Sequence, residues 1–95
     1  MLDKRDFYIN GKWSKPSKKN DFEVINPSNE EPFATISLGH EEDTNAAVKA
    51  AKNAFVKWKE TSKEERIELL EKLLKIYKKR FDEMSNAISI EMGAP

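Results

Sequence analysis

The sequence contains no cysteine, a single histidine and only three glycines in 95 residues. Without cysteine, the chain has no disulfide scaffold, zinc ribbon or thiol nucleophile of its own. One imidazole, that of His40, cannot supply a multi-histidine metal site. The glycines Gly11, Gly39 and Gly93 are too far apart to form a dinucleotide-binding fingerprint or a phosphate loop. These absences exclude, within this chain, the common sites for metals, nucleotides and thiol chemistry.

The sequence also lacks an excess of charge of either sign and any long apolar run. Seventeen basic and seventeen acidic residues give a formal net charge of zero. Nucleic acids and anionic membrane surfaces bind uncompensated basic fields, so we expect no nucleic-acid partner and no membrane partner. No segment approaches the roughly 18 apolar residues of a membrane span, and residues 1–10 hold no apolar run of signal-peptide length. We therefore expect a cytoplasmic protein.

Residues 1–39 are strand-like and rich in turn residues. Phe7–Ile9 and Lys12–Trp13 are aromatic or branched segments on either side of Asn10–Gly11. Asparagine and glycine accept the positive φ angles of a two-residue type I′ turn, which joins antiparallel strands. The pattern predicts a first β-hairpin at this place.

A second hairpin is predicted further along the same half of the chain. Phe22–Ile25 and Phe33–Leu38 are strand candidates, and the segment between them is rich in asparagine and proline, as turns are. Asn29 is the residue that we expect to adopt a left-handed conformation in this turn. Isolated hairpins are marginal in water, so both hairpins should lie on something larger.

A first helix is predicted over residues 40–60. His40 lies near its N-cap, and the carboxylates of residues 41–43 suit the positive pole of a helix. Apolar residues then recur at steps of three and four, and most of them are small enough to permit close approach of a neighbouring backbone. This stripe consists of Thr44, Ala47, Val48, Ala51, Ala54, Phe55 and Trp58.

A second helical region is predicted over residues 62–93. Ser62 and Glu65 have the spacing of a capping box, and the short connection before them implies a helical hairpin. Basic residues end at Arg80 and acidic residues begin at Asp82, a pattern that predicts a break or bend near Arg80–Asp82. We therefore expect a long, bent second helix. Its apolar stripe consists of Ile67, Leu70, Leu74, Tyr77, Phe81, Met84 and Ile88.

Together these elements predict an α+β chain that exposes more apolar surface than it can cover. The residues themselves indicate no reaction. The serines lack the context of a nucleophile elbow, and we expect His40 to be a capping or solvated residue rather than a base. A chain of this size buries only about 60 to 65% of its unfolded surface, so a missing neighbour is expected.

Four motifs in order resemble the beginning of the NAD(P)-dependent aldehyde dehydrogenase superfamily. They are an aromatic hairpin, a strand that ends in Asn-Pro, an alanine-rich helix and a Glu-x-Gly-x-Pro segment. The matching segments are Phe7–Trp13, Phe22–Ser28, Ala46–Phe55 and Glu91–Pro95, and Arg66 with Leu69 and Leu70 fits the family's second helix. The usual Asn-Pro-Ala-Thr-Gly-Glu turn has lost its glycine here, and Ala94 replaces the usual lysine.

The resemblance implies that residues 1–95 are the N-terminal part of an α/β Rossmann-like cofactor domain. Such enzymes oxidise aldehydes to carboxylic acids with NAD or NADP, and their catalytic and cofactor-binding residues come later in the chain. We therefore expect this fragment to be structural, to bind no cofactor and to be inactive alone. Its expected partners are the remainder of the dehydrogenase and, through its apolar helix faces, further copies. Some relatives bind a monovalent cation through backbone oxygens at positions that match Val24 and Ile25.

A non-enzymatic module is the alternative reading. In that case the stripe from Ile67 to Ile88 would form an intermolecular helical bundle. The stripe covers about three heptads, which is short for a coiled coil, and Leu69, Leu73 and Ile76 widen it in a way that favours globular burial.

Overall fold

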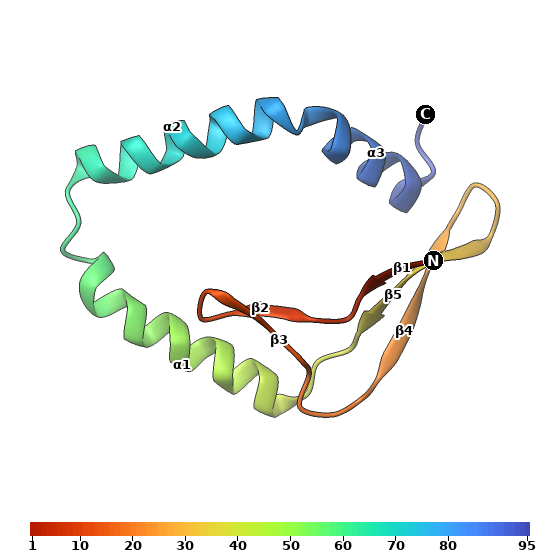
Figure 1. Cartoon of the computed structure of the whole chain (residues 1–95), viewed down its shortest axis with the longest axis horizontal. Coiled ribbons are helices and arrows are strands. Elements are labelled where there is room, and N and C mark those ends of the chain that lie inside the picture. Colours follow the sequence, from red (N-terminus) through yellow and green to blue (C-terminus); the bar gives the residue numbers. More distant parts are fainter.

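The computed structural model describes all 95 residues, which form five strands and three helices. Figure 1 shows the strands gathered together while the three helices follow one another in an open arc. The elements are β1 (Leu2–Lys4), β2 (Phe7–Ile9), β3 (Lys12–Ser14), β4 (Asp21–Asn26), β5 (Glu31–Ser37), α1 (Glu41–Trp58), α2 (Lys63–Lys79) and α3 (Phe81–Met92).

The first hairpin, β2–β3, is confirmed. The strands are antiparallel, with Tyr8 opposite Trp13. Asn10 and Gly11 have φ angles of 56° and 75°, so both central residues of the turn are left-handed, as a type I′ turn requires. The rings of Tyr8 and Trp13 meet edge to face with centroids 5.1 Å apart. An adjacent pair of turn residues thus sets the register that brings the two aromatic rings together.

The second hairpin, β4–β5, is also confirmed, but its left-handed residue is not the expected one. The strands pair antiparallel, with Asn26 opposite Glu31. Glu30 has a φ of 61°, whereas Asn29 does not have a positive φ, so the expectation for Asn29 was wrong. The Asn29 side chain instead accepts a hydrogen bond from the Glu31 amide at 3.0 Å. This Asx interaction closes the turn around Glu30, the position where the family's usual turn has glycine.

The strand β1 was not expected from the sequence. It pairs parallel with β5, with Leu2 opposite Ala34 and Lys4 opposite Ile36, so the order in the three-stranded sheet is β1-β5-β4. With one apolar residue among its three, β1 shows no period that could be recognised. Its strand conformation depends on a partner more than 30 residues away in the chain.

The alanine-rich face of α1 lies against the β2–β3 hairpin. Ala47, Ala50, Ala51 and Ala54 line one shallow depression together with residues 8–11 of the hairpin. Small side chains let the turn approach the helix closely, as the composition of the stripe predicted. The contact ties the two-stranded sheet to the first helix.

The second helical region is two helices rather than one long, bent helix. Arg80 separates α2 from α3 and has φ −107° and ψ 19°, outside the helical range. This interruption falls where the charge pattern predicted a break or bend. The Arg80 guanidinium pairs with Glu83 at 2.9 Å in the first turn of α3. The basic end of one helix therefore meets the acidic start of the next, and the helix divides there.

The expected helical hairpin is wrong, because α1 and α2 do not pack on each other. The larger contacts between elements are β4 with β5, β1 with β5, β2 with β3, α3 with β4, and α1 with β2. Figure 1 shows α1 and α2 diverging from their short connection.

Arg66 holds the joint between these two helices. Its Nε donates to Thr61 Oγ1 at 2.9 Å, and its guanidinium carbon lies 5.6 Å from the centre of the Trp58 ring. Ser62 caps α2 by accepting the Glu65 amide at 3.1 Å. The end of α1 is bound by Arg66 and not by the face of α2, and Leu70 and Leu74 of the α2 stripe remain exposed.

Most of the molecule is surface. Only Ala34 and Ser37 are buried, and the solvent-accessible area is 8306 Å². A compact protein of 11.0 kDa has about 5,600 Å². The radius of gyration is 17.0 Å, whereas about 12 Å is normal for this length. The excess of roughly 2,700 Å² is comparable to an obligate protein interface, so the chain has the geometry of a part that a neighbour covers.

We predict that the 95-residue chain alone does not behave as a compact monomer. In the structure, Leu70 and Leu74 are 64% and 52% exposed, so dilute chain should bind a hydrophobic dye and associate as its concentration rises. Dye fluorescence, sedimentation velocity and small-angle scattering measure these properties. A cooperatively melting monomer with a radius of gyration near 12 Å and no dye binding would contradict the prediction.

Glu30→Gly should stabilise the β4–β5 hairpin. Relief of the left-handed conformation of a residue with a Cβ gains about 1 to 2 kcal/mol, and the extra entropy of glycine offsets about half of it. Amide exchange in the β4–β5 ladder of the full chain should therefore slow about two- to fivefold. The control Glu31→Gly lies in β5 without a positive φ and should speed exchange instead. Equal effects of the two substitutions would contradict the explanation that glycine relieves the left-handed conformation at position 30.

Candidate functional site

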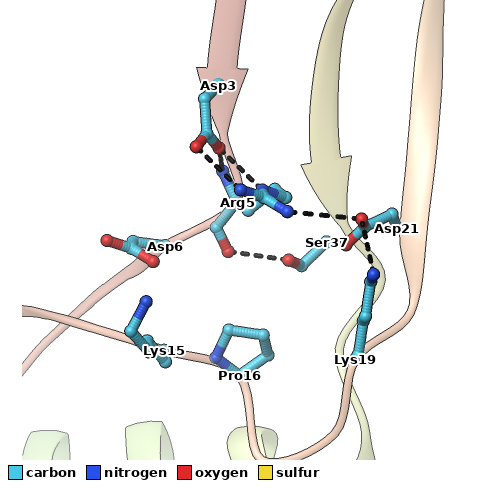
Figure 2. A pocket seen from close by; sticks show the side chains of 8 residues that line it. All are labelled: Asp3, Arg5, Asp6, Lys15, Pro16, Lys19, Asp21 and Ser37. Atoms are coloured by element: carbon cyan, nitrogen blue, oxygen red, sulfur yellow. Dashed lines mark hydrogen bonds and ion pairs between the residues drawn. The ribbon is translucent and has the colours of Figure 1, made fainter.

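A charged cleft, shown in Figure 2, is lined by no hydrophobic residue. It lies where the end of β1, the segment that leads into β4 and the end of β5 meet, and its volume is about 340 Å³. Its lining residues are Asp3, Arg5, Asp6, Lys15, Pro16, Lys19, Asp21 and Ser37.

Arg5 is the centre of this cleft. Its guanidinium binds both oxygens of Asp3, at 2.9 and 3.0 Å, and reaches Asp21 at 3.4 Å. Lys19 lies 4.0 Å from the same Asp21 carboxylate. The hydrogen bonds from Arg5 lower the pKa of Asp3 to about 2, and Asp3 in turn raises the pKa of Arg5. Asp3 therefore stays ionised near neutral pH and cannot act there as a general acid.

Ser37 is the buried residue at the base of the cleft. Its hydroxyl donates to the carbonyl oxygen of Arg5 at 2.7 Å. A hydroxyl that donates its hydrogen to a backbone carbonyl is not bonded to a general base and is therefore not an activated nucleophile. The cleft thus joins β1 to the end of β5 and holds paired charges. The charged groups of the cleft therefore have a structural role. The cleft was not predicted from the sequence, because its residues are up to 34 positions apart.

His40 is the N-cap residue of α1, as the sequence predicted. Its amide donates to the Asp43 carboxylate at 3.0 Å. The same carboxylate accepts the amide and the hydroxyl of Ser17, at 2.9 and 3.1 Å. These bonds, the one from the His40 amide first, lower the pKa of Asp43. Asp43 therefore anchors the segment before β4 to the start of α1, which is a structural role.

Val24 and Ile25 lie next to each other near the end of β4. The pairing register shifts between them, because Val24 is opposite Ala34 whereas Ile25 is opposite Pro32. Such an irregularity disrupts the ladder, and proline has no amide hydrogen to donate. Backbone oxygens at this place can therefore be free of the sheet. Two residues supply at most two such oxygens, so a monovalent cation held there needs further ligands.

The structure has no side-chain cluster of the kind that binds metal ions. No group of three or more histidine, cysteine, aspartate or glutamate side chains is arranged to hold a metal ion. None of the three helices has both the length and the apolar character that crossing a membrane requires. The glycines lie in a hairpin turn, before α1 and after α3, so they do not form a glycine-rich phosphate loop.

Comparisons with known proteins cover almost the whole chain. The model of the aldehyde dehydrogenase family matches residues 13–95. A 3-succinoylsemialdehyde-pyridine dehydrogenase from a Pseudomonas species is 47% identical over 95 residues, and a putative aldehyde dehydrogenase from Staphylococcus aureus is 41% identical. In each case the match covers 100% of this chain and 20% of the relative.

The fold agrees with a solved structure of the same kind. A crystal structure of aldehyde dehydrogenase from Bartonella henselae is similar to all of this chain, with a TM-score of 0.99 and 55% identity, and the similar region is 20% of that protein. The chain thus spans about a fifth of the length of its relatives, and its open arrangement of strands and helices is the one found in the longer protein. The matched sequence motifs and the shared fold together show that this chain belongs to the aldehyde dehydrogenase family.

Proposed function

We propose that this chain is the N-terminal structural part of the cofactor domain of an aldehyde dehydrogenase. The enzyme of which it is a part would oxidise aldehydes to carboxylic acids with NAD or NADP. The main support is the expanded conformation of the chain, which has about 2,700 Å² more surface than a compact protein of its mass. The same conformation is found in a protein five times as long, with a TM-score of 0.99. A shape that does not close on itself suits a part whose faces the remaining polypeptide covers.

The chain supplies no group that touches the reacting atoms. In this proposal the nucleophile, the base and the nucleotide-binding loop come from the remaining four fifths of the enzyme. The role of the 95 residues is to pack against that body through the apolar faces of α2 and α3. In the same proposal, further copies of this chain come together because the intact enzyme is an oligomer. The intact enzyme is also proposed to be cytoplasmic.

The alternative of a self-associating helical module is less well supported. A coiled-coil seam needs a continuous heptad pattern along one helix. Here Arg80 interrupts the helix between Tyr77 and Phe81, so the stripe from Ile67 to Ile88 is divided between α2 and α3.

Complementation tests the proposed function. We expect the chain, mixed with the separately expressed remaining four fifths of the Bartonella henselae relative, to restore NAD(P)-dependent aldehyde oxidation that neither piece shows alone. Leu74→Asp should reduce complementation at least about tenfold, because it places a charge where docking buries an apolar side chain. The control Lys75→Asp introduces the same carboxylate at the next position, off the apolar stripe, and should have little effect.

Two outcomes would contradict the proposal. One is a stable, specific oligomer of the short chain with no complementation, while the relative's own 95-residue segment complements under the same conditions. The other is equal loss with Leu74→Asp and Lys75→Asp, which would mean that the apolar face of α2 is not the docking surface.

We also propose that the backbone oxygens of Val24 and Ile25 contribute to a monovalent-cation site in the assembled enzyme. The melting temperature of the complemented enzyme should then be higher in potassium chloride than in choline chloride of equal ionic strength. Ile25→Val should keep this difference, because a carbonyl oxygen and not the side chain binds the ion. Identical melting temperatures in the two salts would overturn the site.

A further inference from the structure

The three-stranded sheet has an open edge at β1. In the order β1-β5-β4, one side of β1 pairs with β5 and the other side pairs with no strand of this chain. Such an edge presents backbone amide and carbonyl groups that water or another strand must satisfy.

An apolar groove lies between β1 and the helices α2 and α3. Its volume is about 710 Å³, and seven of its eleven lining residues are hydrophobic. Leu2 and Lys4, which share one face of β1, form one side, and Leu73 and Ile76 are on the other. Leu2, Leu73 and Ile76 are 56%, 61% and 53% exposed. We refer to these four residues and the open edge of β1 as the β1 groove.

The helix layer extends beyond the sheet on this side. α2 has 17 residues and is about 25 Å long, whereas three strands span only about 10 Å from first to last. α3 contacts β4, and Figure 1 shows α2 running on past the strands. In layered α/β structures a helix covers a sheet with its apolar face. The helix layer is therefore long enough to cover a wider sheet than this chain contains.

We propose that the β1 groove receives a β-strand from the part of the dehydrogenase polypeptide outside this chain, and that this strand pairs with the open edge of β1. This inference depends on the proposed function and specifies its interface. Backbone pairing satisfies the edge of β1, and alternate apolar side chains of the added strand enter the groove toward Leu73 and Ile76. The sheet then has at least four strands beneath α2 and α3.

A second copy of this chain is a poorer occupant. Each copy offers a β1 of only three residues, so pairing of two such edges gives a very short ladder. The relatives, by contrast, are five times as long as this chain, and the Bartonella henselae protein keeps this segment open at a TM-score of 0.99. The longer polypeptide supplies the missing strand without a change in the shape of the segment.

Hydrogen exchange in a full-length chimera tests the inference. This chain replaces the matching fifth of the Bartonella henselae protein, and NMR follows the amides of residues 2–4. In an edge strand, amides alternate between the paired and the open side. With a strand added, all three amides should exchange at least about 100-fold more slowly than in the free chain.

A pair of variants of the chimera adds a local readout. Leu2→Asp should speed exchange at Lys4 at least about tenfold, because a charge in the groove disfavours the added strand. Val56→Asp is the control, since Val56 is 62% exposed and lies outside the groove, and it should leave Lys4 unchanged.

The possible results separate the inference from the function on which it depends. A folded, active chimera in which an amide of β1 still exchanges rapidly would overturn the added strand and leave the proposed function intact. A chimera that neither folds nor oxidises aldehydes would overturn both. Protection of β1 in the free chain that increases with the concentration of the chain would overturn the added strand in favour of a second copy as the occupant.

Discussion

The apolar faces of α2 and α3 stay largely exposed in this chain, and the other features of its architecture follow from that constraint. Arg66 binds the end of α1 through Trp58 and Thr61, so the two helices diverge from the joint. Arg80 then turns the chain from α2 into α3. Because these joints are made by local contacts, they do not need a core to form. The result is an open frame whose shape is set by local contacts.

Features with local determinants were predicted from the sequence. Asn10 and Gly11 specify their own turn, because two adjacent residues must both accept positive φ. Ser62 caps α2 through an amide three residues away. The reversal of charge around Arg80 marks the end of one helix and the start of the next within a few positions. In each case the interacting groups lie within one or two turns of the backbone, so the sequence pattern contains the whole interaction.

Features with distant determinants were not predicted. The strand β1 exists because β5 pairs with it, and its own three residues carry no signal. The charged cleft joins Arg5 to Asp21 across 16 positions, and Asp43 binds Ser17 across 26. The helical hairpin was expected from a short connection alone, yet the connection length does not determine the angle between helices. That angle depends on which surfaces attract each other, and here the faces of α1 and α2 do not pack on each other.

The turn at Glu30 shows how the family fold is kept at a position where this sequence departs from the family's usual turn. A left-handed glutamate costs about 1 to 2 kcal/mol relative to the glycine that usually stands there, but Asn29 and Asn26 each bond a turn amide through the side chain. At the other end of the chain, Gly93 has a φ of 72° and lies so close to this turn that an added Cβ would be 3.0 Å from Pro27. The turn is therefore fixed both by its own side chains and by the backbone after α3. A residue with an unfavourable φ can persist because its surroundings determine the conformation, which explains why the loss of one motif residue leaves the fold unchanged.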